Sequence, residues 1–256
     1  MKLNDIQNQK DTRKIPINKV GVKGLKYPVV LQDRTNGTQN SVADINMYVE
    51  LPHDFRGTHM SRFVEILHHY HKDTIIDNLE KLLQEMKIKL EADVAYIEMG
   101  FPYFIKKTAP VTKAESLSSY ECGFNASLSN EFIFEMYVKV PVLSLCPCSK
   151  EISKNGAHNQ RAYVTVSILY KDFVWLEELI EIIERSASCE VYSLLKRPDE
   201  KYVTEKSYDN PKFVEDIARD IAIAMKKDVR ISKFTIEAES IESIHNHNAF
   251  AMITNS

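Results

Sequence analysis

The chain has 256 residues, of which 44% are hydrophobic and 27% are charged, and it contains seven glycines and nine prolines. This composition is typical of an ordinary folded protein and excludes a disordered, fibrous or low-complexity chain. The formal net charge of -3 gives no overall field that attracts nucleic acid or an anionic membrane, so we expect neither partner.

The first 20 residues are polar and charged, and we assign 1–20 to a polar N-terminal arm. The arm lacks the apolar segment of a secretory signal. Uninterrupted apolar runs all fall short of the roughly 18 residues that a membrane helix requires. We therefore expect a soluble, cytoplasmic protein, and in that reducing compartment the four cysteines are not expected to form a disulfide framework.

The next segment, 21–130, predicts two strands, two helices and two strands. Residues 27–51 alternate around an Asn36-Gly37 turn signal, which is typical of a β-hairpin. Helical spacing begins after Thr58, which we expect to be an N-cap, and a second helix with an apolar stripe is predicted with Asp73 as its cap. A period near two returns in two later segments, 89–105 and 118–126.

The remaining segment, 131–256, repeats this order and carries most of the chemically interesting residues. Two alternating strands are expected, at 132–140 and 162–170. One helix is predicted with Asp172 as its N-cap, and a longer helix is predicted with Asn210 as its cap and Pro211 at its first position. Closing strands are expected near 231–242 and 247–254.

The repeated order predicts an α+β fold with two ββααββ units, each with a four-stranded antiparallel sheet and a helix pair. Such a sheet leaves its second face and its edges to be covered, and self-association is one way to cover them.

Two cysteines, Cys146 and Cys148, flank Pro147 in the segment SLCPCSKEISKNGAHNQR, and His158 follows on the same connection. Proline cannot continue a central strand, so the thiols lie where a strand ends. A thiolate and an imidazole on one such connection can bind a zinc-like cation. The residues alone leave two alternatives open: buried, inert cysteines beside a surface histidine, and a redox pair.

Other polar residues are ambiguous from spacing alone. His245 and His247 fall near the last hairpin turn, where they line a site or simply face solvent. Glu200 is expected in the loop between two helices, and Glu215 lies beside the apolar stripe of its helix. Periodicity selects neither carboxylate as a ligand.

A second histidine cluster occurs in the segment EILHHYHKD, which contains His68, His69 and His71. We do not expect it to bind a metal, because adjacent helical positions point about 100° apart.

Five segments together resemble the type IB GTP cyclohydrolase family: MYVELPHDFRGTHMSRFVEIL, SLCPCSKEISKNGAHNQRAYV, RPDEKYVTE, FVEDIARD and ESIHNHNAFA. The resemblance extends from about residue 20 to the end. It implies a bimodular tunnelling fold and a homotetramer with active sites at subunit interfaces. It also implies hydrolysis and rearrangement of GTP to 7,8-dihydroneopterin triphosphate with release of formate, the first step of folate, and hence tetrahydrofolate, biosynthesis.

The resemblance places the metal ligands on Cys146, His158 and Glu200. The expected cofactor is one divalent ion per active site, and this mixed set of thiolate, imidazole and carboxylate suits zinc while leaving manganese or iron open. Cys148 is then a neighbour of the site or an alternative ligand.

The substrate contacts follow in the same way. Glu215 falls on the family's guanine-anchoring glutamate, which accepts two N–H donors from the edge of the base. Cys146, Glu242 and His245 are assigned as catalytic, with His245 preferred over His158 for proton transfer. The candidates for contacts with the triphosphate are the basic residues within the matching segments: His59, Arg62, Lys150 and Arg161.

Two other functions compete with this one. Another tunnelling-fold pterin or deazapurine enzyme would use Cys146 as a covalent nucleophile. A non-catalytic purine-binding or metal-binding module would bind GTP without converting it.

Overall fold

The computed structural model describes residues 7, 9–70 and 74–255. Its strands follow one another in the hydrogen-bonded order β1-β2-β3-β4-β5-β6-β8-β9, and the short β7 pairs with β5. The chain divides into two compact units, 1–102 with 123–135 and 103–122 with 136–256. Each unit combines antiparallel strands with helices, as the sequence predicts for an α+β fold.

The first unit begins with a long hairpin of β1 (Ile17–Asp33) and β2 (Gly37–Leu51). Its turn is held by the carboxylate of Asp33, which accepts hydrogen bonds from the backbone N–H groups of Thr35 and Asn36. Gly37 has a φ of 80°, a conformation that favours glycine. The predicted hairpin is therefore confirmed, although β1 starts within the segment assigned to the N-terminal arm.

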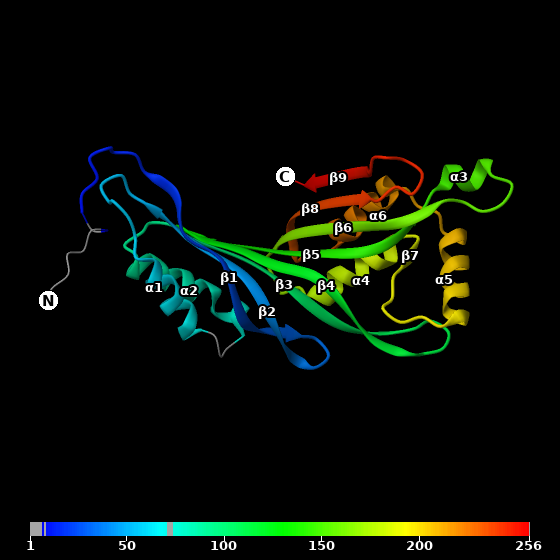
Figure 1. The fold of residues 1–256 in the computed structure, drawn as a ribbon, viewed down its shortest axis with the longest axis horizontal. Coiled ribbons are helices and arrows are strands. Elements are labelled where there is room, and N and C mark those ends of the chain that lie inside the picture. Colours follow the sequence, from blue (N-terminus) through cyan, green and yellow to red (C-terminus); the bar gives the residue numbers. More distant parts are fainter. Residues whose placement is uncertain (1–6, 8, 71–73, 256) are drawn as a thin grey trace. The chain divides into compact units, whose positions relative to one another are not determined.

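Two helices, α1 (Met60–His69) and α2 (Ile75–Lys89), pack against each other and against β1, as Figure 1 shows. The predicted N-cap Thr58 is wrong, because His59 occupies that position and makes no side-chain cap hydrogen bond. Asp73, the predicted cap of the second helix, lies outside the described residues. The apolar stripe predicted for the second helix is largely buried, at Ile75, Leu79, Leu82, Leu83 and Met86. In the first helix Phe63 and Leu67 are buried as predicted, whereas Met60 and Val64 are exposed and Ile66 takes a place in the core.

Strands β3 (Ala95–Thr108) and β4 (Glu115–Leu128) contribute residues to both units. In the first unit β3 pairs antiparallel with β2, with Tyr96 opposite Tyr48.

The second unit contains more elements than the predicted ββααββ order. They are β5 (Phe132–Leu145), α3 (Pro147–Ile152), β6 (Asn159–Tyr170), α4 (Leu176–Ser186), β7 (Cys189–Glu190), α5 (Arg197–Asp209), α6 (Val214–Lys227), β8 (Ile231–Ser240) and β9 (Ala249–Asn255). The predicted helix pair corresponds to α4 and α6, which pack together, and α6 also covers β8 and β9 (Figure 1). The additions are α3, β7 and α5.

Two predicted caps in this unit are wrong. The N-cap of α4 is Trp175, not Asp172, and the backbone N–H of Trp175 donates to the side chain of Glu178. Asn210 ends α5 and does not begin α6. Its amide donates to the backbone carbonyls of Ala187 and Ser188, so tertiary contacts use the group that would otherwise cap a helix.

Among the described residues, the helices include none that is long and apolar enough to cross a membrane.

Candidate active site

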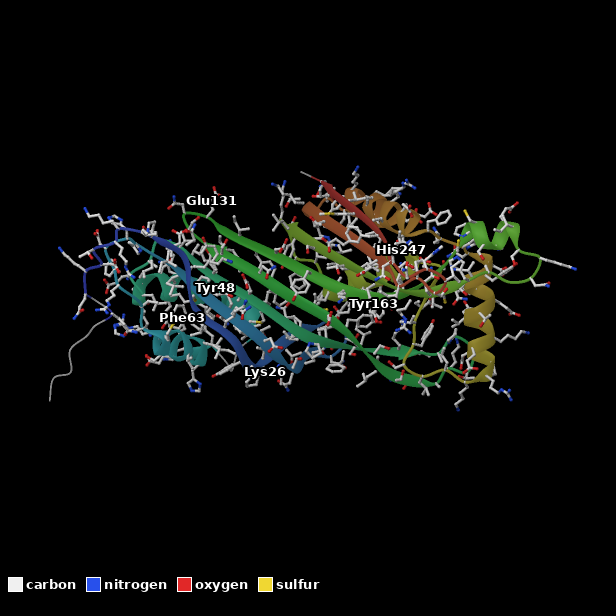
Figure 2. All side chains as sticks on the ribbon, turned by 45° about the horizontal axis from the view of Figure 1, so that its top comes forward. Lys26, Tyr48, Phe63, Glu131, Tyr163 and His247 are labelled. Carbon is white, nitrogen blue, oxygen red and sulfur yellow. The ribbon has the colours of Figure 1, made fainter. Side chains whose placement is uncertain are left out.

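A cavity of about 460 Å³ lies in the second unit. Its walls come from the ends of β5, β6 and β8, the first turn of α6 and the connection 241–248. The lining residues are Ser144, Cys146, His158, Gln160, Phe213, Val214, Glu215, Ser240, Glu242, His245, His247, Asn248, Ala249 and Phe250. Figure 2 labels His247 on this β8–β9 connection.

The floor of the cavity continues the core-facing positions of three strands. Side chains on a strand alternate between its two faces, and the core-facing positions of β5, β6 and β8 are almost all apolar. At the end of each strand the next core-facing position is polar: Ser144 on β5, Gln160 on β6 and Ser240 on β8. The cavity therefore begins where the apolar core ends.

Five residues that the sequence assigns to the active site line this one cavity: Cys146, His158, Glu215, Glu242 and His245. They come from three separate segments of the chain: the β5–β6 connection, the first turn of α6 and the β8–β9 connection. The fold brings them together because β6 and β8 are antiparallel neighbours and because the first turn of α6 lies over the same strand ends.

The segment between β5 and β6 forms a compact turn that fixes Cys146 beside His158. The backbone N–H of Cys146 donates to the carbonyl of His158 at 3.1 Å. Cys146 is the N-cap of α3, and its Sγ accepts the N–H of Ser149 at 3.4 Å. The hydroxyl of Ser149 in turn accepts the N–H of His158 at 3.2 Å. The connection expected between these two strands therefore contains a short helix, α3, that the sequence pattern did not predict.

Gln160 joins His158 to Glu242. Its Nε2 donates to Glu242 Oε1 at 3.1 Å, so its Oε1 faces Nδ1 of His158, 3.0 Å away. This arrangement assigns the proton to Nδ1 and leaves the lone pair of Nε2 free for a ligand. Gln160 is a site residue that was not predicted, although a polar residue at a core-facing strand position is a signal that could have identified it.

The cavity supplies two of the three expected metal ligands. Cys146 and His158 line it, whereas Glu200 is exposed on α5 and does not. Within the described part of the chain, no group of three His, Cys, Asp or Glu side chains is arranged to hold a metal ion. The thiol, the Nε2 lone pair and the Gln160 hydrogen bond nevertheless fit the chemistry of a zinc-like site.

Glu200 lies in the first turn of α5 and not in a loop, so its predicted placement is wrong. The neighbouring Asp199 is fully buried and anchors this turn to the β3–β4 connection. Its carboxylate accepts the N–H groups of Val111 and Thr112 at 2.8 and 2.9 Å and the Thr112 hydroxyl at 2.6 Å. Burial alone raises the pKa of Asp199, but these hydrogen bonds and one from the Lys196 backbone lower it well below its usual range.

The other end of α5 is held by an ion pair between Lys206 and Glu190 of β7, and Tyr192 donates to the same carboxylate at 2.6 Å. Desolvation raises the pKa of Glu190, but the hydrogen bonds from Lys206 and Tyr192 outweigh it and lower the pKa to about 2. Both ends of the helix that carries Glu200 are thus fixed by buried or half-buried carboxylates.

The four candidate triphosphate contacts do not line the cavity. His59 and Arg62 belong to the first unit, where Arg62 donates to the carbonyl of Lys89 at 2.7 Å. Lys150 donates to the carbonyl of Tyr208 and lies over its ring. Arg161 is exposed, and it alternates with Gln160 and so faces away from the cavity floor.

The four cysteines fall into two classes. Cys122 and Cys189 are buried, and desolvation raises the pKa of both thiols, to about 12 for Cys189. Cys146 is half-buried, Cys148 is exposed, and both are free thiols. The alternative in which Cys146 and Cys148 are both buried apolar residues is therefore wrong.

The histidines also separate into two groups. His245 and His247 line the cavity and stack with ring centroids 5.1 Å apart. In the first unit, Tyr27 pairs with Nδ1 of His68, while His69 pairs with Glu85. These partners lie in different directions, as expected for adjacent helical positions, and His71 lies outside the described residues.

Comparison with solved structures identifies the fold. Uricase from Arthrobacter globiformis matches with a TM-score of 0.56 at 9% identity, over 93% of this chain and 92% of that one. Urate oxidase from Bacillus subtilis 168 matches with a TM-score of 0.53 at 10% identity, over 93% and 98%. Urate oxidase is a tunnelling-fold enzyme, so the predicted fold is confirmed.

Comparison with characterised sequences gives much higher similarity. The chain is 56% identical over 254 residues to GTP cyclohydrolase FolE2 of Citrifermentans bemidjiense, covering 99% of this chain and 95% of that protein. It is 56% identical over 249 residues to GTP cyclohydrolase FolE2 of Geobacter sulfurreducens, covering 97% and 96%. These relatives do not favour a covalent Cys146 enzyme or a non-catalytic module.

The sequence pattern described as type I GTP cyclohydrolase folE2 matches residues 3–251. With a match over nearly the whole chain and 56% identity to these relatives, the chain belongs to the type I GTP cyclohydrolase FolE2 family.

Proposed function

We propose that this chain is a hydrolase that converts GTP and water to 7,8-dihydroneopterin triphosphate and formate. The observation that carries the proposal is the single cavity shared by Cys146, His158, Glu215, Glu242 and His245. Hydrolysis at C8 opens the imidazole ring of guanine and releases C8 as formate. Rearrangement of the ribose and closure of the pterin ring follow.

Glu215 binds the guanine base in this proposal. It lies at the second position of α6, where its exposed carboxylate borders the cavity. A carboxylate accepts two parallel N–H bonds from N1 and the exocyclic amine of guanine, a bidentate and charge-assisted contact. Adenine lacks this pair of donors, so Glu215 gives the site its selectivity for guanine.

His245 and Glu242 handle protons beside the base. Both border the cavity, and Glu242 is held by the amide of Gln160. His245 is the group that protonates the leaving ring nitrogen, because Nδ1 of His158 is already bonded to Gln160 and its Nε2 is assigned to the metal.

Cys146, His158 and Glu200 hold the divalent ion in this proposal. When bound, zinc, manganese or iron supplies Lewis-acid activation of the attacking water. The chain's own contribution is to hold the thiol and the imidazole at a fixed turn and to anchor the first turn of α5 through Asp199.

The triphosphate extends beyond the cavity. Among the described residues that line it are two carboxylates and three histidines but no lysine or arginine, which suits a base and not a tetra-anionic tail. We assign the phosphate contacts to His59, Arg62, Lys150 and Arg161, in a homotetramer whose active sites are completed at subunit interfaces. The product feeds folate and tetrahydrofolate synthesis in the cytoplasm.

One experiment tests the function directly. Metal-depleted protein is incubated with GTP, zinc, manganese and iron(II) are added back separately, and formate and the fluorescent oxidised pterin are quantified. We expect both products with at least one metal. Absence of both with every metal contradicts the proposed function.

Two cysteine variants separate the role of the thiols in the same assay. We expect Cys146→Ala to lose at least about 100-fold in turnover, because it removes a metal ligand. Cys148→Ala is the matched neighbour, and we expect it to keep most of its activity. Full activity of Cys146→Ala contradicts the assignment of Cys146 as a metal ligand but does not contradict the proposed reaction.

A further inference from the structure

Ser240 is a buried hydroxyl group on the wall of the cavity. It ends β8, its residue is 1% exposed, and it lies opposite Ala162 of β6 and Ala249 of β9. Within the described part of the chain its Oγ has no hydrogen-bond partner. A hydroxyl group removed from water without a partner is unfavourable, so a structure that retains one has a use for it elsewhere.

The neighbouring Ser144 shows what a structural serine does at the same level of the fold. It is also core-facing, is 3% exposed and lines the same cavity. Its Oγ donates to the carbonyl of Lys212 at 2.9 Å, which ties the end of β5 to the segment before α6. The two serines therefore differ in the one respect that matters: Ser144 is satisfied by the protein, whereas Ser240 is not.

We propose that Ser240 is a further substrate-binding residue, whose hydroxyl donates a hydrogen bond to an acceptor atom of the purine base. This inference rests on the proposed function, because it takes the base of GTP as the occupant of the cavity. Bound base then supplies the partner that the hydroxyl lacks, and the contact is gained only on binding.

The chemistry of the surrounding wall favours the base over the phosphates. Apolar contacts come from Val214, Phe250 and Ala249, and the nearby charges are the carboxylates of Glu215 and Glu242. Carboxylates repel phosphate but accept the N–H donors of guanine. Glu215 accepts hydrogen bonds from the N–H groups on one edge of the base, and Ser240 is left to donate a hydrogen bond to an oxygen or nitrogen acceptor of the base.

The test compares Ser240→Ala with wild type by two measurements. The first is the melting temperature without ligand, and the second is its increase on adding GTP in the presence of a chelator, which prevents turnover. We expect the ligand-free melting temperature of Ser240→Ala to equal or exceed that of wild type, because an unsatisfied buried hydroxyl is removed. We expect GTP to raise the melting temperature of Ser240→Ala by less than it raises that of wild type, by an amount that corresponds to about tenfold weaker binding.

Steady-state kinetics of the metal-loaded enzyme give a second readout. We expect KM for GTP to rise about tenfold, while kcat stays within about threefold, because the contact holds the base and takes no part in proton transfer. Ser144→Ala is the matched control for stability. It leaves the Lys212 carbonyl without its partner, so its ligand-free melting temperature should fall.

Each outcome has a distinct meaning. If Ser240→Ala binds GTP with an affinity within twofold of wild type, the proposed role of Ser240 is overturned. The proposed function still stands in that case, provided that the wild-type protein converts GTP. A fall in the ligand-free melting temperature of Ser240→Ala like that of Ser144→Ala also overturns the role of Ser240, because the hydroxyl then has a structural partner. Failure of wild type to bind and convert GTP refutes the proposed function, and the inference about Ser240 falls with it.

Discussion

Gln160 and Glu242 form a hydrogen bond that crosses from β6 to the connection after β8, with 3.1 Å between Nε2 and Oε1. This bond decides which end of the Gln160 amide faces His158, and so which imidazole nitrogen is free. The buried side chain of Gln160 thus orients the imidazole of His158, a predicted metal ligand, through the ring nitrogen that is not assigned to the metal.

Replacement of Gln160 by leucine should therefore weaken metal binding. Leucine has a similar size but cannot accept the proton of His158 Nδ1, so the ring loses its fixed tautomer and orientation. We expect zinc affinity to fall by about 10- to 100-fold, measured by competition with a chromogenic chelator. Unchanged zinc affinity in a variant with a wild-type circular dichroism spectrum would contradict this role.

Replacement of Glu215 by glutamine should abolish tight binding of GTP. The amide places a donor where guanine also donates, and the charge assistance is lost. We expect binding to weaken by at least about 100-fold, measured by calorimetry with chelated protein. Glu237→Gln, on the exposed face of β8, is the control and should bind like wild type. Equal losses in both variants would point to a general electrostatic effect.

Thiol reactivity should follow burial. Iodoacetamide at neutral pH should label the exposed Cys148 first and the half-buried Cys146 more slowly. Burial raises the thiol pKa of Cys122 and Cys189, so both should stay unlabelled until the protein unfolds. Peptide mass spectrometry over a time course measures the order. Bound zinc should protect Cys146 but not Cys148, and protection of neither would count against the assigned ligand.

Acid stability should depend on Glu190. Because its folded-state pKa of about 2 lies below the ordinary value, the ionised carboxylate stabilises the fold above that ordinary value. This stabilisation is lost as the pH falls through about 2. We expect Glu190→Gln to lower the free energy of unfolding at pH 7 by about 2 kcal/mol, and the difference from wild type to shrink below pH 4. Urea titrations at several pH values measure it, and a pH-independent difference would refute the electrostatic explanation.

The long alternating segments and the amphipathic helices could be predicted from the sequence because burial imposes a strict period on them. The β1–β2 hairpin and the apolar faces of α1, α2, α4 and α6 all follow from that period. Helix α5 could not be predicted in the same way, because only Asp199 and Ser207 are buried on it. It is fixed by polar contacts to distant segments, which leave no periodic signal.

Only some of the residues that line the cavity could be predicted from the sequence. Cys146 and His158 stand out by residue type, and the family resemblance supplied Glu215, Glu242 and His245. Gln160 and Ser240 were not predicted, although each is a polar residue at a core-facing position of an alternating strand. That they meet at one cavity depends on the pairing of β6 with β8, which spacing along one strand does not reveal. The expected cap at Asp172 failed because the local pair of Trp175 and Glu178 begins that helix three residues later. The expected cap at Asn210 failed because its amide is bonded to the distant carbonyls of Ala187 and Ser188.

The polar floor at the ends of β5, β6 and β8 has a consequence for how such a pocket can change. Its three side chains occupy the positions directly after the apolar core, so each can be exchanged without opening a void beneath it. A one-residue insertion in β6, by contrast, would turn Arg161 inward and Gln160 outward, replacing a neutral amide by a cation. Substitution of these side chains can thus adapt the pocket to a heterocycle with different substituents. A shift of register in any of these strands instead destroys the pocket.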